Sequence, residues 1–261
     1  MMRPAALTRK LLRDSWGQRG QFLAIAGVLA AGVATLVATL STLDTLERTR
    51  ADYYRQYDFA QVFAHLKRAP ESLGRELAAL PGVQRLETRV VGEARLSLAG
   101  FPDPVNARLV SLPRRDGGGL NTLFLRAGRL PAPESEREVV ASQAFATAHQ
   151  LRPGDELAVI LNGRLRRLRV VGIGLSPEYV YQIRPGDLFP DPRRYAVLWM
   201  EREGLAAALD LEGAFNDVVL RLAPGASQPR VIELLDRRLE RYGGLGAYGR
   251  DRQLSARYLD Q

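Results

Sequence analysis

The sequence has 261 residues, of which 46% are hydrophobic and 25% are charged. This length allows one or two domains with a core, and the charge content excludes a protein made mostly of membrane spans. The absence of cysteine excludes disulfides, thiolate catalysis and zinc sites built on Cys. The net charge of +8 is compatible with nucleic-acid binding, but the arginines are spread along the chain among acids, as in residues 250–260. We therefore expect no nucleic-acid partner.

Residues 22–43 contain no charged side chain. A helix needs roughly 20 mostly apolar residues to cross a hydrocarbon core of about 30 Å. At roughly −0.3 to −0.6 kcal/mol each, the ten strongly apolar positions favour membrane insertion by about 3 to 6 kcal/mol. These positions are Phe22, Leu23, Ile25, Val28, Leu29, Val33, Leu36, Val37, Leu40 and Leu43.

Three interpretations compete for this segment: a cleaved signal peptide, a buried core helix and a membrane anchor. The apolar core of a signal peptide usually has about 7 to 15 residues, whereas this run is longer and no A-x-A site follows it. A helix that packs on the core of a globular protein usually carries a polar face toward solvent, and this segment has no polar face. We predict a transmembrane helix over residues 21–44 that continues as a charged stalk helix over residues 45–57.

Five basic residues precede the span, opposed only by Asp14. Positive charge before a span favours a cytoplasmic N-terminus, so residues after about 44 are expected outside the cytoplasm and the span in the cell inner membrane. We also predict that residues 1–20 form a basic helix along the cytoplasmic membrane interface, in contact with lipid. The basic residues are Arg3, Arg9, Lys10, Arg13 and Arg19.

Small residues recur four positions apart within the span. Such spacing lets a second membrane helix approach closely, so we predict that these positions pack against another helix. They are Gly27, Ala30, Ala31, Ala34 and Ala38.

The remaining chain alternates helix and strand patterns, which predicts an α+β fold. Residues 70–80, 143–151, 201–211 and 228–243 have helical patterns, and Asn162-Gly163 is typical of a two-residue hairpin turn between strands. We predict one α+β lobe over residues 58–122 and 176–245, with a β-rich lobe inserted over 123–175. Residues 243–249 are predicted to be a flexible hinge, and residues 246–261 the start of a returning stalk.

The chain shows no catalytic or cofactor-binding motif. A P-loop lysine must follow glycine, but Lys10 and Lys67 follow Arg9 and Leu66. His65 and His149 fall in different predicted elements, which supports neither a metal site nor a catalytic triad. We therefore expect no catalytic residue, no metal site and no cofactor, and we expect that the chain is not an enzyme.

Several stretches together follow a known pattern after the basic N-terminus, the span and the stalk. Taken by their order and spacing, the chain resembles the N-terminal portion of an FtsX/MacB-like ABC-transporter permease, with its first transmembrane helix and a MacB-like periplasmic core domain. The stretches are LAALPGVQRLETRV, LRAGRLP, EREVVASQAFATAHQLRPGDEL, RRLRVVGIG, YAVLWM and FNDVVLRLAPGASQPRVIELLD.

The resemblance implies a periplasmic domain of two lobes that moves when a separate cytoplasmic ABC ATPase subunit hydrolyses ATP. It implies a role in export or in the release of lipids, lipoproteins or other hydrophobic compounds. The partners it implies are that ATPase, a second copy of the permease or a homologue, membrane lipid and a periplasmic adaptor. Three further spans follow such a domain in this family, so the sequence is expected to be a truncated piece or a broken reading frame of a longer permease. The alternatives are the extracytoplasmic sensor domain of a membrane receptor and an anchored extracytoplasmic enzyme.

Overall fold

The computed structural model describes residues 19–98, 100–113, 119–180, 182–183, 187 and 189–253. Its chain divides into two compact units, Met1–Tyr53 and Tyr54–Gln261, which we describe separately. The predicted interfacial helix over residues 1–20 falls almost wholly outside the described residues.

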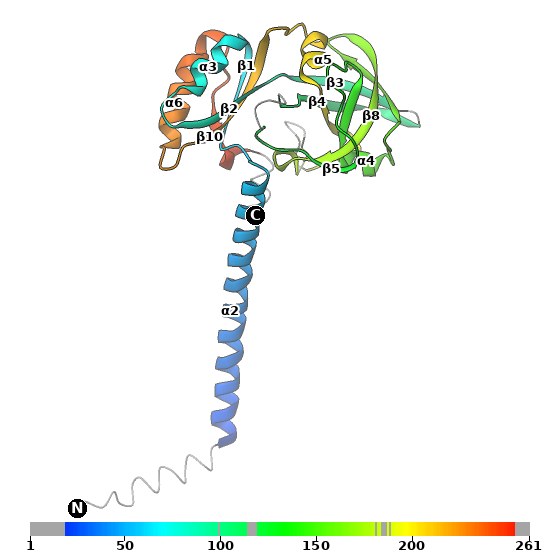
Figure 1. Cartoon of the computed structure of the whole chain (residues 1–261). Helices are drawn as coiled ribbons and strands as arrows, with labels where there is room; N and C mark the ends of the chain where they lie inside the picture. The colour runs from blue at the N-terminus through cyan, green and yellow to red at the C-terminus, as the bar shows by residue number, and fades with distance from the viewer. Residues whose placement is uncertain are drawn as a thin grey trace, which may run out of the picture. The chain divides into compact units, whose positions relative to one another are not determined.

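The described residues of the first unit belong to helix α2 (Arg19–Gln56), which is unbroken over 38 residues and continues into the start of the second unit (Figure 1). Its stretch Leu23–Thr42 has a mean hydropathy of 2.3, the one helix in the described chain that is long and apolar enough to cross a membrane. At 1.5 Å per residue, these 20 residues extend about 30 Å. The predicted span and the predicted stalk therefore lie on one continuous helix.

Threonine hydroxyls in this helix donate to main-chain oxygens four residues earlier. Thr35 donates to Ala31 at 2.9 Å, and Thr42 donates to Ala38 at 2.8 Å. A hydroxyl bonded in this way needs no water, so these threonines are compatible with a hydrocarbon environment.

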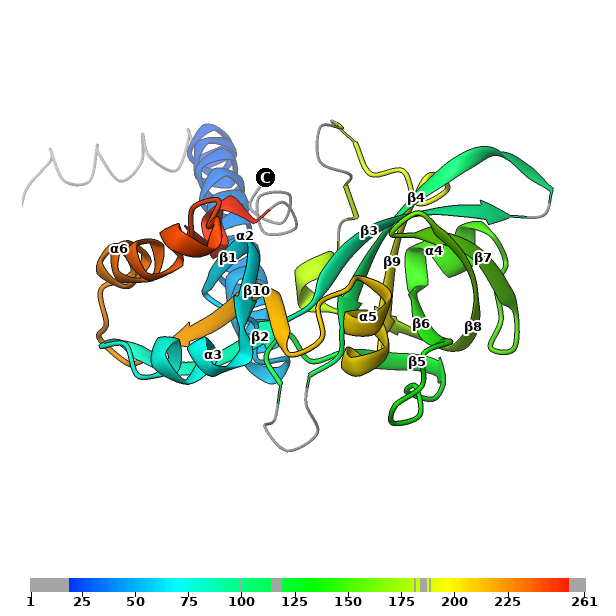
Figure 2. The ribbon, with the colours of Figure 1, turned by 90° about the horizontal axis from the view of Figure 1, so that it is seen from above.

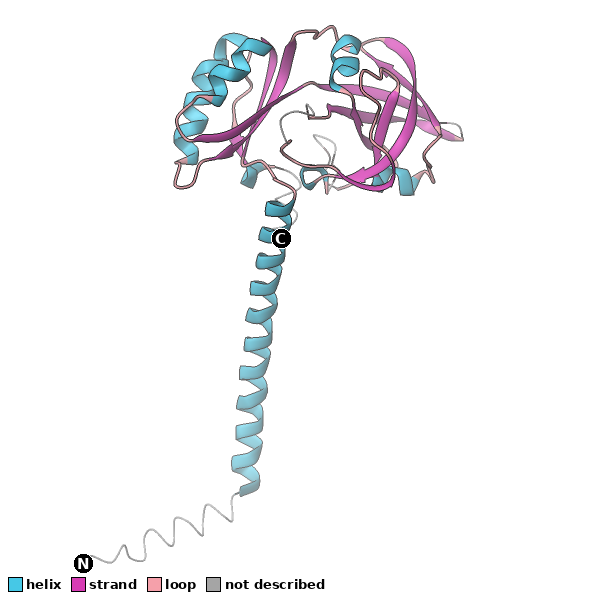
Figure 3. Ribbon diagram, viewed as in Figure 1, coloured by secondary structure: helices cyan, strands magenta, loops and turns pink. Residues whose placement is uncertain are grey.

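In the second unit, the first and last strands of the described chain lie in a four-stranded antiparallel sheet with the order β11-β1-β10-β2. Helices α3 and α6 cover one face of this sheet (Figure 3). Side chains alternate along β1, so Val62, Ala64 and Leu66 face these helices. Phe63 and His65 lie on the opposite face. Its elements are β1 (Val62–Pro70), α3 (Glu71–Ala78), β2 (Val83–Arg89), β10 (Ala214–Leu222), α6 (Gln228–Leu239), the 3-10 turn η2 (Glu240–Tyr242), β11 (Tyr248–Gly249) and the 3-10 turn η3 (Arg250–Arg252).

The chain between β2 and β10 forms a seven-stranded sheet with the order β5-β8-β6-β9-β4-β3-β7 (Figure 2). Strand β8 also pairs with β7, which closes all but β5 into a barrel. Its elements are β3 (Val91–Leu98), β4 (Phe101–Ser111), β5 (Phe124–Gly128), β6 (Glu138–Ser142), α4 (Gln143–Ala148), β7 (Glu156–Leu161), β8 (Arg164–Leu175), the 3-10 turn η1 (Pro177–Tyr179), β9 (Tyr195–Met200) and α5 (Arg202–Ala208).

Strand β9 explains where the barrel core lies, because all six of its residues are buried. Ala196, Leu198 and Met200 face the barrel interior, while Val197 and Trp199 pack outside it against the chain that follows β8. The hairpin predicted at Asn162-Gly163 is confirmed: it joins β7 to β8, and both residues have positive φ, 49° and 72°.

The α+β class with a β-rich insertion is confirmed, but the predicted limits of the insertion are wrong. Strands β3, β4 and β9 lie outside residues 123–175 and belong to the barrel, because β4 pairs in parallel with β9 and closes the ring with β3. We call residues 90–213 the barrel lobe and residues 57–89 with 214–253 the sheet lobe. The predicted hinge at 243–249 and the predicted start of a returning stalk at residue 246 are also wrong where β11 pairs with β1. Residues 254–261 of that predicted stalk lie outside the described residues.

Candidate functional site

Four polar side chains cross the sheet lobe on the face opposite α3 and α6. Arg89 of β2 lies in register with Asp217 of β10, and Asp217 in register with His65 of β1. Tyr248 of β11 completes the set through its hydroxyl, 3.2 Å from His65 Nε2. We call Arg89, Asp217, His65 and Tyr248 the polar row.

Arg89 connects this row to the barrel lobe. Its Nε donates to Asp217 Oδ1 at 2.7 Å, and its two terminal nitrogens donate to Glu178 Oε2 at 2.5 Å and Oε1 at 3.0 Å. Glu178 lies on η1, directly after the long strand β8. Since Arg89 and Glu178 are each 3% exposed, this bidentate pair is almost wholly shielded from bulk solvent.

Burial and neighbouring charges shift the pKa values of Asp217 and Arg89 in opposite directions. Burial alone raises the pKa of Asp217, but the Arg89 guanidinium and the His65 ring outweigh it and hold the pKa well below its ordinary value. Burial lowers the pKa of Arg89, yet Asp217 and Glu178 raise it well above the usual range. Asp217 and Arg89 are therefore charged at neutral pH although both are buried.

Asn121 extends the network to the residues that follow α2. Its Nδ2 donates to Glu178 Oε2 at 2.6 Å, and its Oδ1 accepts from Ala60 N at 2.7 Å. Its main-chain N donates to Asp58 O at 3.0 Å. We call residues 57–61 the incoming segment, and Asn121 links it to the carboxylate that holds Arg89.

Asp58 of the incoming segment has a φ of 47°, which is unusual for a residue other than glycine. Arg85 Nη1 donates to its Oδ2 at 3.1 Å, and Arg221 Nη1 donates to its Oδ1. Arg85 and Arg221 lie on neighbouring strands β2 and β10. The backbone of the incoming segment is thus held in a defined bend by two arginines of the sheet lobe.

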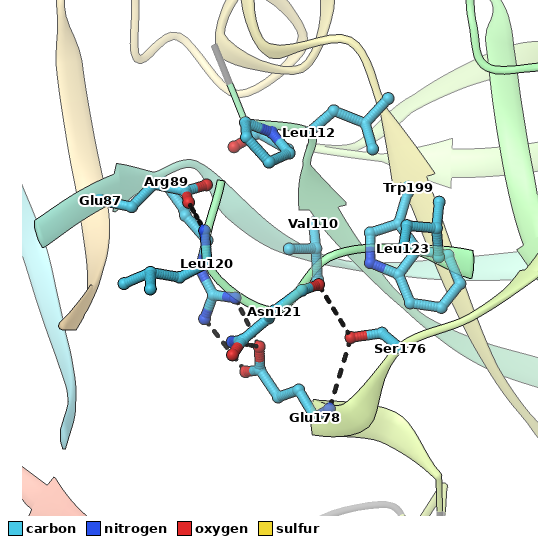
Figure 4. Close-up of a pocket in the computed structure, with 12 residues that line it drawn as sticks. Glu87, Arg89, Val110, Leu112, Leu120, Asn121, Leu123, Ser176, Glu178 and Trp199 are labelled. Carbon is cyan, nitrogen blue, oxygen red and sulfur yellow. Dashed lines mark hydrogen bonds and ion pairs between the residues drawn. The ribbon is translucent and has the colours of Figure 1, made fainter. Parts of the chain in front are cut away.

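A small cavity lies beside this network, lined by Glu87, Arg89, Asn121, Glu178 and Trp199 among others (Figure 4). Figure 4 shows the Glu178 carboxylate between the Arg89 guanidinium and the Asn121 amide. The cavity offers about 20 Å³ to the centres of water molecules, and one water needs roughly 10 to 15 Å³. It therefore has room for water and not for an organic ligand.

Two further contacts join the lobes. Arg202, the first residue of α5, donates to the main-chain oxygen of Thr88 and to Glu71 at the start of α3. Asn216 of β10 forms a pair of hydrogen bonds with the main chain of Val91, at 2.8 and 2.7 Å. The side chains of Arg202 and Asn216 thus join the two lobes by hydrogen bonds.

Among the described residues, no group of three or more His, Asp or Glu side chains could hold a metal ion. His65 belongs to the polar row, and His149 Nε2 lies 2.9 Å from the main-chain oxygen of Arg193. The two histidines thus make separate contacts.

The sequence-predicted residues of the span lie on α2, where the large apolar side chains that the structure describes are exposed. Gly27, Ala30, Ala31, Ala34 and Ala38 are exposed on the same helix. Of the predicted orientation charges, Arg19 begins α2, whereas Arg3, Arg9, Lys10 and Arg13 lie outside the described residues.

Sequence reasoning missed Arg89, Glu178 and Asp217. One signal was present, because Asp217 interrupts the apolar stretch AFNDVVL of β10, and a charge inside a buried strand needs a partner. Its partner Arg89 is 128 positions away in sequence, so no local motif joins the two.

No family model matches this sequence, and no curated protein does. Among solved structures, the chain is similar to the periplasmic region of MacB from Actinobacillus actinomycetemcomitans, with 12% identity, 78% of this chain and 94% of that chain covered, and a TM-score of 0.44. It is similar to the extracellular domain of the noncanonic ABC-type transporter YknZ from Gram-positive bacteria, with 11% identity, 73% and 98% covered, and a TM-score of 0.44. A domain assigned to a permease protein from Porphyromonas gingivalis gives 15% identity, 78% and 98% covered, and a TM-score of 0.42. At these values, none of the three likenesses assigns a function to the chain.

Proposed function

We propose that the chain is the membrane-anchored N-terminal part of an FtsX/MacB-like ABC-transporter permease. In this proposal a separate cytoplasmic subunit hydrolyses ATP, and the resulting motion reaches the domain of residues 54–261 through helix α2. The activity served is export, or the release of a lipid or lipoprotein. The chain itself is not an enzyme.

The observation that carries the proposal is the continuity of α2. One helix contains the apolar stretch Leu23–Thr42 and runs without a break to Gln56, directly before the incoming segment. The 14 residues from 43 to 56 extend about 21 Å beyond the apolar stretch. Because an α-helix bonds its own backbone throughout, it can transmit displacement or rotation as a rigid element.

A second feature agrees with a domain placed between two membrane segments. Strand β11, close to the end of the described chain, pairs with β1, the first strand after α2. The chain therefore arrives at the sheet lobe and leaves it on neighbouring strands. We propose that the chain after this pairing begins a returning stalk.

The charges before the span support the orientation. Arg9, Lys10, Arg13 and Arg19 lie within 14 residues of Leu23 (23 minus 9), where basic residues have their strongest influence on topology. We propose an N-terminus in the cytoplasm, the span in the inner membrane and residues 54–261 outside the cytoplasm.

The small residues of α2 support a helix partner in the membrane. At 100° per residue, Gly27, Ala30, Ala31, Ala34 and Ala38 fall within an arc of about 100° around the helix. Leu29, Val33, Leu36 and Leu40 fall on the opposite side. We propose that the small face packs against a helix of the same permease or of its second copy, while the bulky face contacts lipid. The other proposed partners are the cytoplasmic ATPase and a periplasmic adaptor.

The reading frame downstream of Gln261 tests this proposal against a receptor. Three further apolar spans in frame, together with co-purification of an ABC ATPase encoded nearby, are the expected result. A single second span followed by kinase motifs would instead establish a sensor domain and overturn the permease proposal.

A further inference from the structure

The returning segment, residues 248–253, lies directly on the incoming segment. Strand β11 contributes only two register pairs to the sheet, Gly249 with Val62 and Tyr248 with Phe63. The Tyr248 ring stacks on the Phe63 ring, with centroids 5.6 Å apart and planes 19° from parallel. A strand of two residues is a weak attachment by itself, because most of the stability of a sheet comes from longer pairing.

Arg250, which directly follows β11, supplies a further attachment. Its main-chain N donates to Gln61 O at 3.0 Å, its Nε to Ala60 O at 2.9 Å and its Nη2 to Phe59 O at 2.5 Å. Its guanidinium carbon lies 4.6 Å from the centroid of the Phe59 ring. One residue thus bonds three consecutive carbonyl groups of the incoming segment.

The geometry requires arginine at this position. The guanidinium holds its donors in a rigid plane, so neighbouring carbonyls can be bonded at once while the flat face rests on an aromatic ring. A lysine has a single flexible ammonium group and cannot reproduce both the fork and the stacking.

The incoming segment is held from its other side as well. Asn121 and the two arginines on Asp58 fix its backbone to the lobes. A residue that binds the carbonyl groups of the incoming segment is therefore held in place together with the segment that follows α2.

We propose that Arg250 is a positioning residue that fastens the returning segment to the incoming segment, so that the two shift as one body. The role of this contact in coupling rests on the proposed function: a displacement delivered by α2 would reach the chain after β11 directly, without first crossing the barrel lobe. The fastening itself depends only on contacts within the sheet lobe.

Hydrogen–deuterium exchange of the full chain in detergent tests the fastening. The variants are Arg250→Ala and Arg250→Lys, with Arg252→Ala as matched control, since Arg252 is exposed and belongs to the same 3-10 turn. We expect Arg250→Ala to speed exchange on the order of 10-fold in peptides covering residues 248–253, the change for losing about 1.4 kcal/mol of local stability. The exchange rate of Arg250→Lys should fall between those of the parent and Arg250→Ala. The exchange rate of Arg252→Ala should match that of the parent.

Peptides from β10 serve as the internal reference and should exchange as in the parent. Exchange within twofold of the parent in Arg250→Ala, or an equal rise in Arg252→Ala, would overturn the proposal. A rise spread evenly over β1, β10 and β11 in both Arg250 variants would overturn it too, because the residue would then stabilise the lobe as a whole. Neither ATP nor a partner is present in this experiment, so its outcome is independent of whether the downstream reading frame encodes a permease.

Discussion

Replacing Arg89 with methionine removes the cation that donates hydrogen bonds to both buried carboxylates, Asp217 and Glu178. Methionine keeps much of the length of the side chain, so the change acts mainly on charge. Asp217, which is fully buried, would keep its contact with His65 and its electrostatic interaction with Arg108. Glu178 would lose both hydrogen bonds from the guanidinium and keep that from Asn121.

The expected cost follows from burial. Removing one partner from a buried ion pair costs about 3 to 5 kcal/mol, because the remaining charge stays away from water without compensation. The Arg89 side chain is only 4% exposed and makes three hydrogen bonds to the two carboxylates, so we expect a value within that range. For a unit of this size, about 2 to 4 °C per kcal/mol gives a fall in melting temperature of about 6 to 20 °C.

Fluorescence of Trp199 is a suitable probe, because this residue is 4% exposed and lines the cavity beside Glu178. The full chain would be melted in detergent with Trp16→Phe as background, so that Trp199 is the only indole. Arg230→Met is the matched control, since the Arg230 side chain is 61% exposed and pairs with Glu233 of the same helix, α6. We expect this control to shift the melting temperature by no more than about 2 °C.

A triple variant separates charge from packing. With Arg89→Met, Asp217→Asn and Glu178→Gln together, no buried charge of the set lacks a partner, so at least half of the loss should be regained. The reasoning is refuted if Arg89→Met melts within 2 °C of the parent, or if the triple variant melts as low as Arg89→Met alone.

Three other outcomes are expected. Because folding lowers the pKa of Asp217, its contribution to folding stability is complete above its unfolded pKa of about 3.9 and is lost as pH falls through its folded pKa. The difference in melting temperature between the parent and Asp217→Asn should therefore shrink below pH about 4. A difference that stays constant would contradict this. In a urea titration, Gly128→Ala should destabilise the protein by about 3 kcal/mol, since its φ is 74° and a Cβ would lie 2.2 Å from Val171 O. Gly163→Ala, with a φ of 72° and open space around the Cβ, should cost about 1 kcal/mol. Equal costs would show that the close approach at Gly128 does not matter. Ala31→Leu should reduce disulfide cross-linking between introduced cysteines in the span by several-fold relative to Leu29→Ala, and equal cross-linking would remove the small face as a contact.

Local patterns in the sequence predicted the elements well where neighbouring residues decide the structure. The Asn162-Gly163 turn follows from the tolerance of these two residues for positive φ, and α3 follows from Leu73 and Leu77 on one face. The long apolar run predicted α2 because a span depends on length and composition alone.

Strand pairing could not be predicted in the same way. Whether β9 pairs with β4 or with a strand of another lobe depends on residues about 90 positions apart (106 and 195), which no local pattern joins. The polar row was hidden for a related reason, since Arg89, Asp217 and His65 come together only once β2, β10 and β1 are in register. The predicted hinge at 243–249 failed because its glycines indicated flexibility, while Tyr248 found a stacking partner in Phe63.

Thiol accessibility tests most directly the central claim, that α2 anchors an extracytoplasmic domain. The chain has no cysteine, so a single introduced cysteine reports one position. In spheroplasts, we predict that a membrane-impermeant maleimide labels Arg126→Cys, on the exposed surface of β5, at once. It should label Lys10→Cys only after the membrane is opened. Labelling of Lys10→Cys in intact spheroplasts, with Arg126→Cys protected, would contradict the account.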